Sequence, residues 1–121
     1  MKTLVAFILL WIGAETDNNT NIPHPKIILV PESTLTKMHY GNQKAEDTVH
    51  ALYNTENNTI YLKDTFNQYK VFDKGVLMHE IMHYVHDMNG AVGTKFDCIA
   101  QSEAAIYVSY THLKLQTNPY V

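Results

Sequence analysis

The hydrophobic pattern of this 121-residue chain alternates between strand-like and helix-like segments, which predicts an α+β domain. Residues 27–30 form an apolar run between two prolines, as expected of a short buried strand. Residues 49–53 and 59–62 are two more strand-like runs, and the polar turn between them predicts a hairpin. Ser33 is expected to cap a short helix that Gly41 ends. These segments together predict a small sheet.

Two longer helices are predicted in the second half of the chain. The first extends from Asp73, its expected N-cap, to a stop at Gly90, and it contains no proline. Its apolar residues cover a broad surface, which indicates a largely buried helix: Val76, Leu77, Ile81, Tyr84, Val85 and Met88. The second extends from Asp97, its expected N-cap, to about Leu113. Its apolar stripe consists of Ile99, Ile106, Tyr110 and Leu113.

The first of these helices contains two histidines four residues apart, His79 and His83, with Glu80 beside the first. Positions four apart lie one above the other on a helix, so both imidazoles can point at one cation about 2.0–2.1 Å away. Glu80 can reach a water on that cation without ligating the metal. In a shuffled chain of this composition the pattern is expected roughly 0.02 times, so chance is a weak explanation. The pattern therefore predicts a zinc site, either catalytic or purely structural.

A third ligand is needed, because zinc sites in proteins use three or four protein ligands. Glu103 lies on the apolar stripe of the second helix, between Ile99 and Ile106. A carboxylate on the core side of a helix is costly unless it is paired or ligates a metal. Glu103 is therefore the candidate third ligand; the alternative is that it lies at the edge of the stripe and reaches water.

The spacing of His79, Glu80, His83 and Glu103 resembles that of the gluzincin metallopeptidases, the thermolysin-like group. This resemblance implies a minimal zincin-like domain, in which a small sheet packs against the HExxH helix and a second, ligand-bearing helix. It implies one Zn²⁺ held by the two histidines and Glu103, with Glu80 as general base, and a cleft lined by residues 59–62 as an edge strand. Residues 98–105 also resemble small uncharacterised secreted bacterial proteins.

The chain departs from the gluzincin pattern at two points. Tyr107 stands one turn after Glu103, where the family has an aspartate that orients a zinc histidine. No later segment supplies an obvious counterpart of the family's transition-state-stabilising histidine. Residues that could act there, or support the ligands, are Tyr107, Tyr110 and His112.

Two other zinc-peptidase patterns would give different ligand sets. Residues 93–97 resemble the aspzincin pattern, which would make Asp97 the third ligand, but a helix cap suits Asp97 better. The metzincin pattern fails, because His86 and Asn89 occupy its glycine and third-histidine positions. His86 is expected at the surface. Cys98 is the only cysteine and is expected to be a small buried residue, so no internal disulfide can form.

The N-terminal segment, residues 1–14, has one lysine, an apolar run and a small-residue pair, as in a secretory signal cleaved after Ala14. This predicts a secreted or periplasmic protein with a flexible lead-in at residues 15–24 and a metallopeptidase domain at 25–121. The alternatives are a buried N-terminal strand or helix and an uncleaved membrane anchor. Loss of Lys2 would change the net charge from −3 to −4.

The mildly acidic charge and the absence of Lys/Arg clusters argue against nucleic acid and anionic membranes as partners. The sequence therefore predicts a zinc metallopeptidase that acts on a peptide or protein substrate, with no membrane contact after signal cleavage. The alternative function is a non-catalytic, zinc-stabilised module that binds proteins.

Overall fold

The computed structural model describes residues 1–45 and 48–90, and these form an α+β domain. Its helices are α1 (Lys2–Glu15), α2 (Glu32–Tyr40) and α3 (Val71–Met88). Its strands are β1 (Lys26–Val30), β2 (Ala51–Asn54) and β3 (Thr59–Lys63). The predicted α+β class is confirmed. The helix predicted from Asp97 to Leu113 lies outside the described residues.

The three strands form one mixed sheet in the order β1-β3-β2. β2 and β3 pair antiparallel, which confirms the predicted hairpin, and Asn58 in its turn takes the left-handed conformation with φ 53°. β1 pairs parallel with the other side of β3. The prediction that residues 59–62 form an edge strand is therefore wrong. β3 lies at the centre because it is the most deeply buried strand, with Ile60 and Leu62 fully enclosed.

Two other local predictions need correction. β1 is an edge strand, and Leu29 in it is half exposed, so the predicted full burial of this apolar run is wrong. α2 follows Pro31 as its N-cap instead of Ser33, which lies inside the first turn. Proline already has the extended backbone that a helix entry needs, and no side-chain cap forms. Gly41 ends α2 as predicted, with φ 61°.

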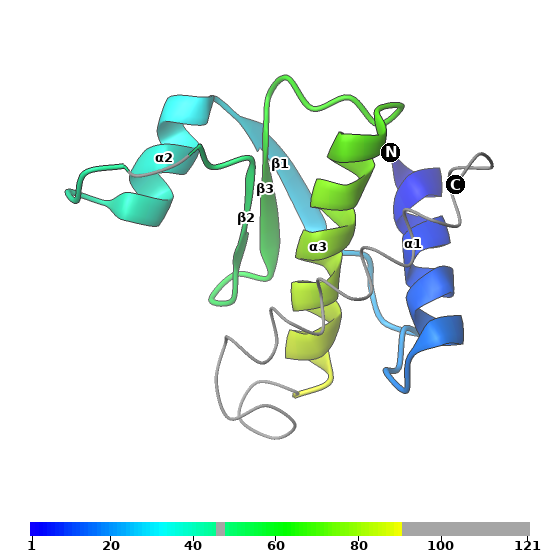
Figure 1. The fold of residues 1–121 in the computed structure, drawn as a ribbon. Helices are drawn as coiled ribbons and strands as arrows, with labels where there is room; N and C mark the ends of the chain where they lie inside the picture. The colour runs from blue at the N-terminus through cyan, green and yellow to red at the C-terminus, as the bar shows by residue number, and fades with distance from the viewer. Residues whose placement is uncertain (46–47, 91–121) are drawn as a thin grey trace.

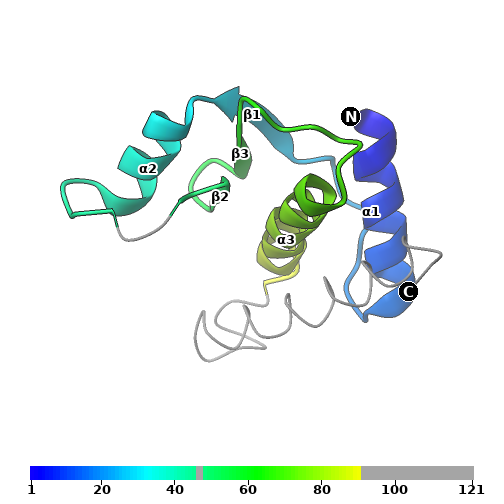
Figure 2. The ribbon, with the colours of Figure 1, turned by 45° about the horizontal axis from the view of Figure 1, so that its top comes forward.

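The helix α3 lies between the sheet and α1 (Figures 1 and 2). The core fills both interfaces and draws on all three layers: Val5, Ile8, Leu9, Ile12, Ile60, Leu62, Leu77, Met78, Ile81, Met82 and Val85. The apolar run near the N-terminus therefore folds as a helix against the body of the domain. Among the described helices, none combines the length and the apolar character that crossing a membrane requires.

The ends of α3 differ partly from the prediction. The helix begins at Val71, and Asp73 lies in its first turn, where its carboxylate accepts the backbone N–H of Asn67 at 2.8 Å. Asp73 thus closes the preceding loop and is not the N-cap. Gly90 follows the C-cap with φ 66°, as predicted for a helix stop.

The predicted broad burial of α3 is confirmed along most of its length. Met88 is the exception among the residues expected inside, with 44% of its surface exposed. His86 is only 3% exposed, so its expected surface position is wrong. The sheet lies on one side of α3 and α1 on the other (Figure 2).

Candidate active site

The middle of α3 brings the two motif histidines together. The ring centroids of His79 and His83 lie 5.0 Å apart, with the ring planes at 73°. Both residues are partly exposed. This arrangement follows directly from the four-residue spacing in an uninterrupted helix. Two imidazoles at this separation suit a shared cation.

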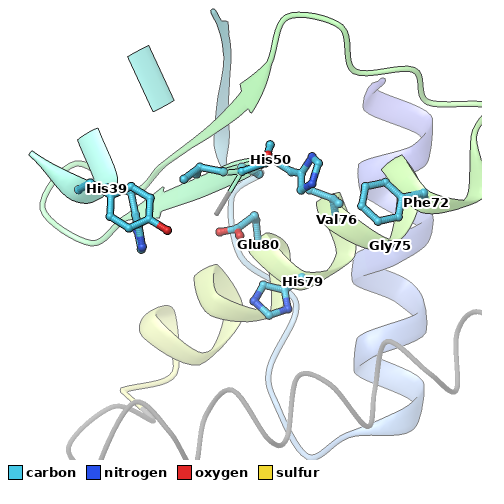
Figure 3. Close-up of a pocket in the computed structure, with 11 residues that line it drawn as sticks. His39, His50, Phe72, Gly75, Val76, His79 and Glu80 are labelled. Atoms are coloured by element: carbon cyan, nitrogen blue, oxygen red, sulfur yellow. The ribbon is translucent and has the colours of Figure 1, made fainter. Parts of the chain in front are cut away.

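Glu80 is 8% exposed and its carboxylate points from α3 into a cleft (Figure 3). The cleft has a volume of about 410 Å³ and lies between α3, the segment that leads into β2, and the end of α2. His79 lies at its margin, and His50 faces it from the β2 side (Figure 3). The residues that line it are His39, Tyr40, Thr48, Val49, His50, Ala51, Phe72, Gly75, Val76, His79 and Glu80. The carboxylate of the motif therefore has access to a space large enough for part of a peptide.

Small residues make room for this cleft on both of its sides. Gly75 stands one turn before His79 on α3, and Ala51 opens β2. Glycine inside a helix costs roughly 0.5–1 kcal/mol relative to alanine. That cost is consistent with a position that lines the cleft, where a side chain would reduce the space beside the motif.

The opposite end of α3 is joined to the hairpin by hydrogen bonds. Tyr53 Oη donates to Asp87 Oδ2 at 2.6 Å, and Asn58 Nδ2 donates to the same oxygen at 3.1 Å and to Tyr53 Oη at 2.9 Å. The ring of Tyr84 packs edge-to-face on Tyr53, with centroids 6.0 Å apart. Burial, and then the bond to Asp87, raise the pKa of Tyr53 well above its ordinary value. Burial likewise raises the pKa of Tyr84.

Comparison with known proteins gives a family. A family model described as a domain of unknown function, DUF6647, matches residues 1–116. The chain belongs to the DUF6647 family. No curated protein and no solved structure matches it. The matched region contains α1, the cleft and all the candidate ligands.

Only some of the predicted metal ligands lie in the described part of this DUF6647 domain. Within residues 1–45 and 48–90, no three His, Cys, Asp or Glu side chains come close enough to hold a metal ion. His79 and His83 supply two donors that fit zinc. The absence of a group of three does not extend to residues 46–47 and 91–121. Glu103 and the alternative Asp97 lie in the second of these segments, outside the described residues, as do Tyr107, Tyr110, His112 and Cys98.

Most residues of the cleft were not singled out by the sequence. His39 and Tyr40 come from the end of α2, and His50 from the entry to β2, where its ring packs edge-to-face on Phe72 at 5.1 Å between centroids. His50 could have been noticed, because the predicted hairpin places it at the start of a strand near the motif helix. The position of α2 depends on a parallel β1–β3 pairing that no local pattern reveals.

Proposed function

We propose that this DUF6647 domain is a zinc-dependent metallopeptidase of minimal zincin-like architecture. The observation that carries the proposal is the arrangement on α3, with paired histidine rings at 5.0 Å and a carboxylate that enters the adjoining cleft. The resemblance of the motif and of Glu103 to the gluzincins supports the same function.

His79 and His83 would hold the zinc, with Glu103 as the third ligand. Bound zinc supplies a Lewis acid, which polarises a carbonyl and makes a water more acidic at neutral pH. The imidazoles are suitable donors in their neutral form, and binding is therefore expected to weaken in acid. One Zn²⁺ per chain is proposed.

Glu80 would act as the general base. Two observations support this role: Glu80 is only 8% exposed, and its carboxylate points into the cleft that a substrate would enter (Figure 3). In this mechanism Glu80 accepts a proton from the water as its oxygen bonds to the carbonyl carbon. It then returns the proton to the amine nitrogen as the C–N bond breaks.

The substrate would bind as an extended peptide along β2. Among the described strands, β2 lies at an edge of the sheet, with β3 paired on one side, and Ala51 at its start lines the cleft. An edge strand can pair with an extended peptide through its main chain. That mode would bring a peptide bond past Glu80 and is compatible with a peptide or a protein substrate.

The test replaces Glu80 with glutamine, which keeps the shape but removes the base. Wild type should cleave members of a mixed peptide library, and Glu80→Gln at equal zinc content should be slower by about 10²–10⁴-fold. Glu56→Gln makes the same chemical change in the exposed hairpin turn and should leave the rate unaltered. If wild type cleaves nothing, or Glu80→Gln cleaves as fast, the peptidase proposal fails and the zinc-stabilised, protein-binding alternative replaces it.

A further inference from the structure

The N-terminal helix α1 is buried with a regular helical period. Val5, Ile8, Leu9 and Ile12 are each at most 5% exposed, at spacings of three, one and three residues. On the outer side of the same helix, Phe7 is 51% and Leu10 73% exposed. A removable leader requires only a sufficiently apolar stretch. α1 instead presents one defined face to the core shared with α3.

The chain that leaves α1 is fastened to α3. Asn19 and Asn89 exchange two hydrogen bonds, from Asn19 N to Asn89 Oδ1 at 2.9 Å and from Asn89 Nδ2 to Asn19 O at 3.0 Å. Tyr84 Oη donates to the carbonyl of Pro23 at 2.6 Å. These bonds join residues about 60 to 70 positions apart. The returning segment is therefore fitted to the C-terminal half of α3.

Gly13, half of the small-residue pair that predicts a cleavage site, has a packing role. A Cβ atom at Gly13 would lie 2.5 Å from Oγ1 of Thr20, closer than real Cβ contacts. Glycine at this position thus leaves room for the Thr20 side chain of the returning segment at the end of α1. Thr16 completes this corner, since its hydroxyl donates to the Ile12 carbonyl at 2.7 Å.

From these observations we infer that α1 is a permanent part of the folded domain, which remains on the mature protein and supports α3 on the side away from the sheet. Without α1, the core would lose four enclosed aliphatic side chains, and the α3 surface beneath them would meet water. The inference holds whether or not the domain is a peptidase.

Two neighbouring leucines provide the test. Leu9→Ala removes a buried side chain and should lower the melting temperature of the full chain by roughly 10 °C or more. Leu10→Ala removes the same atoms from the exposed side and should change it by about 3 °C at most. Failure of Leu9→Ala alone to fold would support the inference equally. Similar melting temperatures for both variants would overturn it.

The intact mass gives a second, independent measurement. The full chain, produced in a bacterial host with a functioning export system, should retain residues 1–14 and its mass of 13.8 kDa. A folded mature protein that begins at residue 15 would overturn the inference, whatever the leucine variants do.

Discussion

The interface between β2 and α3 has two ends, which are formed by the same strand and the same helix. At one end, here called the closed end, side chains fill the interface; at the other, the open end, lies the cleft. Ala51 and Tyr53 are two residues apart and therefore lie on the same side of β2. At the closed end, Tyr53 packs on Tyr84 and donates to Asp87. At the open end, Ala51 faces the cleft that Gly75 also lines.

This difference indicates that side-chain size opens the cleft. A tyrosine fills the space between strand and helix where an alanine two residues earlier leaves it empty. The hydrogen bonds of the closed end, two of which reach the carboxylate of Asp87, hold the strand against the helix. The cleft beside Glu80 therefore lies next to a part of the sheet that side-chain contacts join to α3.

The largest effect is expected from filling the open end. Ala51→Phe would give this position a ring like that of Tyr53, and aromatic residues suit strands, so the melting temperature should be retained. Because the ring would occupy space beside Glu80, kcat/KM for peptide cleavage should fall by at least about tenfold at unchanged zinc content.

Ala51→Ser is the matched control, since it keeps the residue small and should preserve most of the activity. Loss of activity in the serine variant as well would mean that the identity of the side chain matters, and not its size. Full activity of Ala51→Phe would contradict the assignment of this cleft as the substrate site.

A smaller effect is expected from loosening the closed end. Tyr53→Phe removes the hydroxyl that donates to Asp87, while Asn58 continues to donate to that carboxylate. The free energy of unfolding, measured in urea, should fall by about 1 kcal/mol. Tyr61→Phe removes a hydroxyl that accepts an exposed hydrogen bond from Asn57 and should cost less than about 0.5 kcal/mol. Equal costs would show that the Tyr53–Asp87 bond does not fasten the hairpin.

The same variant has a defined pH dependence. The pKa of Tyr53 in the folded chain is raised above its ordinary value of 10.0, by burial first and by Asp87 second. Above pH 10 the unfolded state therefore loses the Tyr53 proton while the folded state still holds it. The stability that the protonated Tyr53 contributes is complete below that pH and declines as the pH rises above it. Stability should decline less steeply in Tyr53→Phe than in wild type. Parallel declines would contradict the raised pKa.

The hairpin, the stop at Gly90 and the face of α3 were predictable because each depends on residues a few positions apart. The central place of β3 was not, since it depends on pairing with β1 some thirty residues earlier, as in Lys26↔Thr59. The caps at Ser33 and Asp73 were misassigned because Pro31 and the loop at Asn67 determine where these helices begin. The closeness of the His79 and His83 rings was predictable from their four-residue spacing alone. The place of His50 in the cleft was not predictable from spacing, because its ring packs against Phe72, which is distant in the sequence.

Zinc content tests the central claim most directly. The full chain, loaded with zinc, dialysed and analysed for metal, should hold about one equivalent. His83→Ala and Glu103→Ala should each lose most of it, whereas Asp97→Ala and the exposed His24→Ala should retain it. A wild type without bound zinc, or a His83→Ala variant with a full equivalent, would contradict a zinc site on α3. If Asp97→Ala lost its zinc and Glu103→Ala retained it, Asp97 and not Glu103 would be the third ligand.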